Sequence, residues 1–295
     1  TLDNVIYLTY FNFFMDLRDR ICEYLGGIFS KKDFLLEQAT RYVMLNRGHL
    51  WRPLVVLKTG EAYQVPFDVS MPYAVEIECV HNATLVLDDL PCMDNSPMRR
   101  GQESCHFKFG ENIAVLCSTY LINKAIMLTC TGPAQGNKNA IMMNEVAEAG
   151  EKLLLGQEID LHHTRNKDLN GLLEFYRLKS GALYGSAAVL GGILGDASSE
   201  DLLLLREFGM NLGVAYQLGD DLYDRVGQES ALGKPVGKDV KQVTPINLIG
   251  IDEVRRLRTD YEDRARDCLR KINGDFSMLE ELITKISGTH QDVSS

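Results

Sequence analysis

Apolar residues recur at helical spacing along nearly the whole chain, and this pattern limits the possible folds more than any other feature. Two clear examples are the stretches 153–161 and 202–215. With only 8 Pro and 25 Gly in 295 residues, and no evenly spaced short alternating segments, strands are not expected. The sequence therefore predicts an all-α fold.

The predicted helices are separated by Gly, Pro and Ser positions, which commonly end helices. They cover roughly 1–29, 33–46, 52–64, 70–90, 111–131, 138–163, 169–178, 180–195, 199–225, 245–272 and 276–287. No segment has the length and composition of an interdomain linker, and no period of about 20–50 residues repeats. We therefore expect one domain over residues 1–295.

Charge and cysteine content exclude several classes of protein. The net charge is −10, which argues against a nucleic-acid partner, because such proteins need a basic surface. The longest uncharged stretch, 180–195, is shorter than a membrane span requires, so no transmembrane segment is expected. The 7 Cys residues form no CxxC pair and suggest reduced thiols. The expected location is the cytoplasm, or a plastid-type organelle matrix if a transit peptide has been removed.

Two acidic clusters stand out, and each follows an apolar run that predicts a helix. They consist of Asp88, Asp89 and Asp94, and of Asp220, Asp221 and Asp224. We expect both at helix C-terminal ends, where the backbone dipole disfavours a bare carboxylate. One interpretation is that the two clusters are solvated helix ends. The other is that they bind a divalent cation, because all-oxygen ligands with room for water and phosphate suit Mg²⁺.

Basic residues next to helix breaks accompany these clusters, namely Arg52, Arg99, Arg100, Lys179 and Lys234. Such side chains can converge on the phosphate groups of a ligand. Neither a P-loop nor a GxGxxG motif is present, so a nucleotide is not indicated. The ligand predicted from these residues carries several phosphates, held by metal on one side and by cations on the other.

Taken in order, these motifs resemble those of the trans-isoprenyl diphosphate synthases, the farnesyl and geranylgeranyl diphosphate synthase family. The shared elements are Arg52-Pro53, Glu78 to His81, DDxxxxD at Asp88, Arg99-Arg100-Gly101, His106 to Glu111, Gly156-Gln157 with Asp160, Lys179-Ser180-Gly181, Gln217 with DDxxD at Asp220, and Leu232-Gly233-Lys234 before Gly237-Lys238-Asp239. The resemblance covers most of the chain. It implies a single-domain helical bundle around a deep central cavity, normally a homodimer, with a heteromer as the alternative.

The resemblance also implies the cofactor and the role of each site residue. Three Mg²⁺ ions, with Mn²⁺ as the alternative ion, would bridge the carboxylates and an allylic diphosphate. The first ligands would be Asp88, Asp94 and Asp220, with Asp89, Asp221 and Asp224 as ligands or as partners of metal-bound water. The allylic diphosphate (dimethylallyl, geranyl or farnesyl) would be held by Arg99, Lys179, Ser180, Gln217 and Lys234. Isopentenyl diphosphate would be held by Arg52, His81 and Arg100.

Product length in this family depends on the helix that enters the first acidic cluster. A large aromatic side chain four or five residues before the first Asp stops growth at fifteen carbons. Here these positions are Thr84 and Ala83, and Ile126 stands where the next helix often has Phe. These substitutions are either ordinary core changes or the sign of an open pocket, which would favour geranylgeranyl diphosphate (C20) over farnesyl diphosphate (C15).

The sequence also departs from the family pattern. The usual Lys of the GGKRxRP motif is His49, which is a weaker phosphate ligand because it is mostly neutral at pH 7. A usual Gly-Asp pair is Ser118-Thr119, and an expected Lys is Gln242. A partner subunit without catalytic activity therefore stays an alternative, although both acidic clusters are complete. A class I terpene cyclase is disfavoured, because 219–224 lacks its second metal motif.

Overall fold

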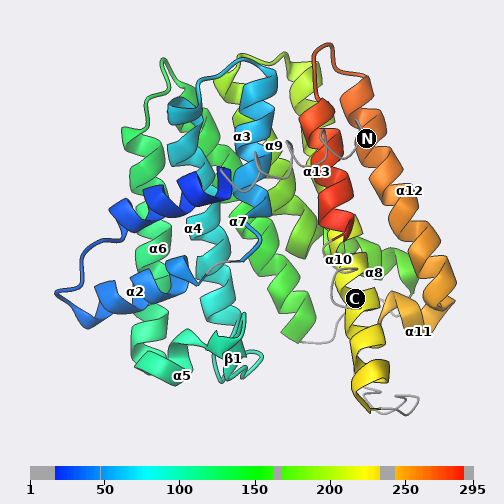
Figure 1. Ribbon diagram of the computed structural model, residues 1–295, viewed down its shortest axis with the longest axis horizontal. Helices are drawn as coiled ribbons and strands as arrows, with labels where there is room; N and C mark the ends of the chain where they lie inside the picture. Colours follow the sequence, from blue (N-terminus) through cyan, green and yellow to red (C-terminus); the bar gives the residue numbers. More distant parts are fainter. Residues whose placement is uncertain (1–16, 47, 162–167, 233–242, 289–295) are drawn as a thin grey trace, which may run out of the picture. The chain divides into compact units, whose positions relative to one another are not determined.

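The computed structural model describes residues 17–46, 48–161, 168–232 and 243–288, without the side chains of 226–232 and 287. The described residues are nearly all helical, which confirms the all-α prediction (Figure 1). A first helix covers 17–28. The labelled elements are α2 (Leu35–Leu45), α3 (Trp51–Ala62), α4 (Phe67–Asp88), β1 (Met98–Arg99), β2 (Gln102–Glu103), α5 (Cys105–Phe109), α6 (Glu111–Thr131), α7 (Lys138–Leu161), α8 (Leu169–Tyr176), the π-helical turn η1 (Arg177–Gly181), α9 (Ala182–Leu194), α10 (Ser199–Leu232), α11 (Pro245–Ile249), α12 (Ile251–Arg270) and α13 (Ser277–Gly288).

The chain forms two compact units. The first contains residues 1–57 and 67–143, and the second contains 58–66 and 144–295. Helices α3 and α7 each contribute residues to both units. The expectation of one domain over 1–295 stays a prediction.

Helix α4 forms the core of the first unit and ends at the first acidic cluster. Its side chains are buried on nearly every face, as expected for an apolar helix enclosed by others. The buried side of α6 packs along α4, and the Ser118 hydroxyl donates a hydrogen bond to the Ala83 carbonyl (3.0 Å). Ser118, one of the departures from the family pattern, therefore links the two helices of this unit.

Helix α6 also carries an exposed apolar face. Within the described residues it is the one helix that is long and apolar enough to cross a membrane, although core helices of soluble proteins pass the same test. Its buried residues include Ala114, Cys117, Leu121 and Ala125. Its exposed large apolar side chains are Val115, Leu116, Ile122, Ile126 and Met127.

Helix α9 occupies the core of the second unit, with every residue from Ala182 to Leu194 buried. It packs against α10, which also packs against α12. The crossing of α10 with η1 is very close, because a Cβ at Gly213 would lie 2.6 Å from the Cα of Gly181. The uncharged stretch 180–195 is therefore core helix.

Several element boundaries differ from those predicted. The segment 245–272 is two helices, divided at Gly250, where φ is +83° and a helix cannot continue. The short pair β1–β2 and helix α5 were not expected. Helix α10 continues to Leu232, well beyond the second acidic cluster, because few residues in 226–232 oppose helix formation.

Candidate active site

The first acidic cluster follows the end of α4 in a tight turn. The amide of Asp94 donates to the carbonyl of Asp88 (2.9 Å), and the amide of Ser96 donates to that of Asp89 (3.1 Å). These bonds satisfy carbonyls that the helix end leaves free. The turn folds Asp94 back towards Asp88, as the DDxxxxD spacing would require for joint metal binding.

The Asp89 side chain pairs with Arg99. The residue is 2% exposed, and its two carboxylate oxygens share the Arg99 Nε–H (3.1 and 3.2 Å) while one also accepts from Nη2. The carboxyls of Asp88, Asp89 and Asp94 raise the pKa of Arg99, against the opposing effect of burial. Within this unit, Asp89 positions Arg99, and their predicted roles in metal and diphosphate binding stay predictions.

The hairpin β1–β2 presents Arg100 from its turn. Arg99 pairs with Gln102, and the two turn residues Arg100 and Gly101 have φ of +52° and +75°. Positive φ at both turn positions suits a two-residue hairpin, but it costs free energy at a residue with a side chain. Contacts of the Arg100 guanidinium with the protein oppose this cost. They include hydrogen bonds to the Asn46 carbonyl (2.9 Å) and Asn82 Oδ1 (3.1 Å).

Three predicted ligands of isopentenyl diphosphate lie together in this unit. Nη1 of Arg52 is 3.2 Å from Nε2 of His81, and Nη2 of Arg100 is 3.4 Å from the same atom. Burial, together with the nearby Arg52 and Arg100 charges, lowers the pKa of His81 well below its usual range. The imidazole is therefore neutral, and Nε2 accepts the guanidinium hydrogen bonds. This arrangement holds two cationic side chains close together.

Glu78 is the acid behind this basic group. It is buried, its Oε1 accepts a hydrogen bond from Asn82 Nδ2 (2.7 Å), and Asn82 in turn contacts Arg100. Burial raises the pKa of Glu78, while the Arg100 and Arg52 charges and the Asn82 hydrogen bond act in the opposite direction. The sequence includes Glu78 in a motif but does not show that it is a positioning residue.

His49 lies in a stack that the sequence did not reveal. Its ring stacks on Trp51, with centroids 5.7 Å apart and an interplanar angle of 11°. The Arg18 guanidinium lies over the Trp51 ring, 4.4 Å from its centroid. Burial and the charges of Arg18 and Arg100 lower the pKa of His49, so it is neutral at pH 7. Within the described residues, Nε of Arg18 and Nε1 of Trp51 are buried without hydrogen-bond partners.

The second acidic cluster lies inside α10, which corrects the prediction of a helix end. Asp220 and Asp224 are one turn apart on this helix. The hydroxyl of the buried Tyr176 donates to Asp221 Oδ2 (2.5 Å), so Asp221 is directed towards α8. Tyr176 is a positioning residue that no motif indicated.

The turn η1 carries two further predicted site residues, although no helix break lies there. Lys179 pairs with Asp160, and the Ser180 hydroxyl donates to Gln217 Oε1 (2.9 Å). A π-helical turn shifts side chains relative to an α-helix and often marks a functional site. Helix α7 approaches this turn at Gly156, where a Cβ would lie 3.1 Å from the backbone N of Lys179.

Gln157 provides a test of whether this unit suits a polar ligand. Its side chain is 9% exposed, and neither its nitrogen nor its oxygen has a hydrogen-bond partner among the described residues. It follows Gly156 directly and is three residues before Asp160. Buried polar groups are nearly always satisfied, so this amide is suited to a ligand, an ion or water beside Lys179.

The remaining predictions are not all supported. Lys234 lies outside the described residues, as do Lys238 and Gln242. Ala83 is buried in α4, and the open pocket inferred from its small size stays a prediction. Ile126 is 42% exposed, so it does not line the packing between α4 and α6, and that part of the argument is wrong. Leu121 and Ala125 face the interior of this unit instead.

The donor set of the two clusters suits Mg²⁺, although no metal group is assembled in advance. Among the described residues, no three His, Cys, Asp or Glu side chains converge as a metal site. All six Asp side chains offer hard carboxylate oxygens, and those of Asp89 and Asp221 also accept hydrogen bonds from Arg99 and Tyr176. Additional oxygens from water and phosphate would complete such a site, which is typical of Mg²⁺.

Comparison with known proteins places this arrangement in a family. A model of the polyprenyl synthetase family matches residues 33–286. The geranylgeranyl diphosphate synthase of Pseudescherichia vulneris is 32% identical over 257 residues, 84% of this chain and 83% of that protein. Geranylgeranyl pyrophosphate synthase 10, mitochondrial, of Arabidopsis thaliana is 35% identical over 244 residues, 79% of this chain and 71% of that protein.

A solved structure agrees with these sequence relatives. Geranylgeranyl pyrophosphate synthetase from Pyrococcus horikoshii Ot3 has a TM-score of 0.83 and 27% identity, covering 95% of this chain and 98% of that chain. The region matched by the family model contains both acidic clusters and the basic residues around them. This protein belongs to the polyprenyl synthetase family.

Proposed function

We propose that this enzyme condenses isopentenyl diphosphate with an allylic diphosphate and releases a C15–C20 all-trans prenyl diphosphate, mainly geranylgeranyl diphosphate. The observation that carries the proposal is the pair of complete, all-carboxylate clusters in a chain of this family, each beside ordered cationic side chains.

The cofactor of the proposed reaction is Mg²⁺. Asp88, Asp94 and Asp220 are its first ligands, with Asp224 as a further oxygen donor. When bound, the ions neutralise the carboxylates and stabilise the negative charge on the departing diphosphate. Since each cluster supplies too few oxygens alone, we expect metal and allylic diphosphate to bind cooperatively.

The cationic side chains hold the allylic diphosphate while its bond to carbon breaks. Lys179 is fixed by Asp160, and Ser180 by Gln217, so the donors are oriented before the substrate arrives. Arg99 is fixed in the same way by Asp89. The preorganised charge favours departure of diphosphate as an anion.

The second substrate is held by Arg52, Arg100 and the neutral His81. Its double bond attacks the allylic carbocation, a carbon–carbon bond forms, and the proton lost from the isopentenyl unit passes to the released diphosphate. Water must be excluded, because it would convert the cation to an alcohol. No nucleophilic side chain is required.

The small buried Ala83 supports the longer product. It lies in α4 five residues before Asp88, where a bulky side chain would obstruct a growing prenyl chain. We therefore expect the enzyme to accept farnesyl diphosphate and to extend it to C20.

We also propose that the enzyme is a homodimer. One face of α6 packs against α4, so a membrane span would require this helix to leave the core of its unit. Its other face exposes Leu116, Ile122 and Ile126. A second copy of this chain is the occupant that would cover them.

The test is product analysis of the purified protein with each allylic substrate. An active synthase forms product alone, whereas a partner subunit without catalytic activity forms product only after mixing with an active synthase. Asp88→Asn and Asp220→Asn should each remove activity by several orders of magnitude while the circular dichroism spectrum stays helical. Product formation by the protein alone that survives both substitutions would contradict the proposed site.

A further inference from the structure

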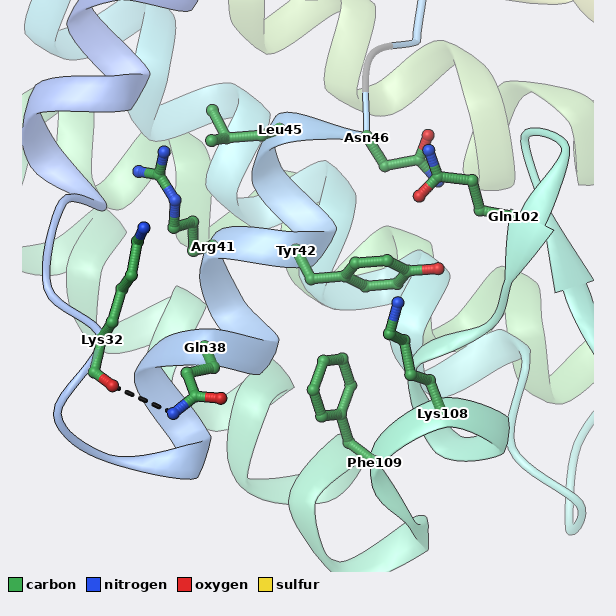
Figure 2. Close-up of a pocket in the computed structure, with 9 residues that line it drawn as sticks. All are labelled: Lys32, Gln38, Arg41, Tyr42, Leu45, Asn46, Gln102, Lys108 and Phe109. Atoms are coloured by element: carbon green, nitrogen blue, oxygen red, sulfur yellow. Dashed lines mark hydrogen bonds between the residues drawn. The ribbon is translucent and has the colours of Figure 1, made fainter.

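A basic groove lies in the first unit between α2, α5 and the β1–β2 hairpin. Its cavity volume is about 470 Å³. Figure 2 shows its lining, which combines cations, amides and an apolar wall. The residues are Lys32, Gln38, Arg41, Tyr42, Leu45, Asn46, Gln102, Lys108 and Phe109.

The charge of the groove is unusual for this chain. Three cationic side chains, Lys32, Arg41 and Lys108, line it, and no carboxylate does, although the chain has a net charge of −10. Within the described residues none of the three forms an ion pair. Like charges that share a cavity repel one another, and a bound anion would relieve that repulsion.

The cations are held in place by the groove itself. Arg41 Nη1 donates to the Phe29 carbonyl (2.9 Å), which leaves its other N–H groups for a ligand. The Lys108 ammonium lies 4.0 Å from the centroid of the Tyr42 ring. Gln38 Nε2 donates to the Lys32 carbonyl (3.0 Å), which fixes the backbone from which Lys32 extends (Figure 2).

Glu37 and Glu103 adjoin lining residues in the sequence but do not line the groove. The Glu37 carboxylate accepts hydrogen bonds from the backbone amides of Asp33 and Phe34 before the start of α2. The backbone carbonyl of Glu103 accepts a hydrogen bond from the Tyr42 hydroxyl (2.8 Å). Burial is the main cause of the raised pKa of Tyr42, and the charge of Glu103 adds to it. Neither carboxyl lines the cavity.

Two lining residues connect the groove to the proposed active site. Asn46 donates from Nδ2 to the Arg99 carbonyl (3.1 Å) and accepts from Arg100 Nη1 through its own carbonyl (2.9 Å). Gln102 is the strand partner of Arg99 in the hairpin. A ligand that displaces either residue would therefore move the backbone that carries both arginines.

We propose that this groove is a second anion site, which binds a diphosphate group and acts on the reaction through Asn46 and the Arg99-Arg100 hairpin. Three cations and three amides supply donors for a compact, multiply charged anion, and the apolar wall is too small to hold a long prenyl chain. The ligand we assign is free inorganic diphosphate, which the proposed reaction releases. The regulatory part of this proposal rests on the proposed function, whereas the binding part does not.

Calorimetric titration of the full-length protein with inorganic diphosphate tests the binding. It is done without Mg²⁺, so that the acidic clusters repel the anion. Lys32→Gln with Lys108→Gln should weaken binding about tenfold or more, because two charge-assisted contacts are lost. The matched control is Lys31→Gln with Lys271→Gln. These substitutions remove the same charge, and both lysines are exposed and lie outside the groove. The control and Lys179→Gln should bind as the unchanged protein does.

Three results would overturn the site: no binding by the unchanged protein, equal weakening in the matched control, or loss of binding in Lys179→Gln alone. Farnesyl diphosphate titrated in parallel distinguishes the sources of the anion. If farnesyl diphosphate binds as tightly as inorganic diphosphate or more weakly, the ligand is free diphosphate. If farnesyl diphosphate binds much more tightly, and the groove variant loses this binding, the ligand is the head group of a prenyl diphosphate.

Inhibition kinetics with Mg²⁺ test the link to catalysis. The unchanged enzyme should show a component of diphosphate inhibition that excess allylic substrate does not relieve. The groove variant should lose this component while its kcat without added diphosphate is unchanged. Purely competitive inhibition of both enzymes would overturn the regulatory link. If binding in the groove persists but no prenyl product forms, the proposed function fails and the anion site stands.

Discussion

Glu76 is a carboxylic acid with no exposed surface, in the middle of α4 beside Thr129 of α6. Burial disfavours the charged form and raises the pKa of Glu76 to about 8. An unfolded Glu has its ordinary pKa of 4.5. Between these two values the folded protein keeps a proton that the unfolded chain releases, so this residue lowers stability as the pH rises from 4.5 towards 8.

Glu76→Gln should therefore stabilise the protein, and more so at high pH. We expect a gain on the order of a few kcal/mol at pH 8–9 and little gain near pH 4.5, because the amide needs no proton to be neutral. Denaturant unfolding at several pH values measures this. Glu151→Gln removes an exposed carboxylate and is the control, with no comparable pH dependence expected. A gain that does not change with pH would contradict the buried-acid explanation.

His49 stands where the motif that the sequence resembles has a lysine. The charges near it come from Arg18, which lies over the same Trp51 ring, and from Arg100. His49→Lys should lower KM for isopentenyl diphosphate roughly tenfold, since one ionic contact to phosphate is worth on the order of 1–3 kcal/mol. Arg18→Gln should raise that KM, and adding His49→Lys should restore it. Steady-state kinetics in both substrates provide the measurement, with KM for the allylic diphosphate as internal control. An unchanged KM in His49→Lys would count against this prediction.

At the scale of elements, the close approach of α7 to the turn η1 keeps Lys179 in position. Gly156→Ala places a Cβ 3.1–3.2 Å from the backbone of Lys179, so either α7 or η1 must shift by a few tenths of an ångström. We expect kcat/KM to fall about tenfold to a hundredfold, with helical content retained. Gly150→Ala lies on the same helix, where an added Cβ meets nothing within 4 Å, and should leave activity unchanged. Equal activity of the two variants would show that this approach does not position Lys179.

The helices were largely predictable because their periodicity and their stop signals are local. The same local signals could not indicate the hairpin Met98–Glu103, whose two strands contain only two residues each. They also could not indicate η1, because the break that they predict at residue 179 is a π-helical turn, ending at Gly181, that joins two helices without interruption. The end of α10 was misplaced because the acidic cluster was interpreted as a helix end, whereas its charge is compatible with a helix that continues.

Motifs name the candidate site residues, but the side chains that position them were found only in the structure. The pairs Asp89–Arg99 and Tyr176–Asp221 join residues that are 10 and 45 positions apart. No sequence spacing predicts such contacts, because they depend on how helices pack. Arg18 was missed for the same reason, since it reaches Trp51 from the helix over 17–28.

For the whole molecule, the exposed face of α6 leads to a prediction about assembly. Ile122→Glu with Ile126→Glu should convert the proposed dimer to a monomer, because buried charges without partners oppose association. Light scattering after gel filtration measures the mass. Leu203→Glu changes a leucine of α10 that is 65% exposed and should leave the dimer intact. The proposal that this face of α6 is the dimer interface would be contradicted if the unchanged protein were a monomer, or if the α6 variant were still a dimer.

The central claim is that this chain by itself is a prenyl diphosphate synthase with a pocket open beyond fifteen carbons. The most direct test is to incubate the purified protein with Mg²⁺, isopentenyl diphosphate and farnesyl diphosphate, and to identify the product chain length. We predict a C20 product that EDTA abolishes. A reaction that stops at C15 from the shorter allylic substrates would contradict the open pocket at Ala83, and no product from any allylic substrate would contradict the central claim.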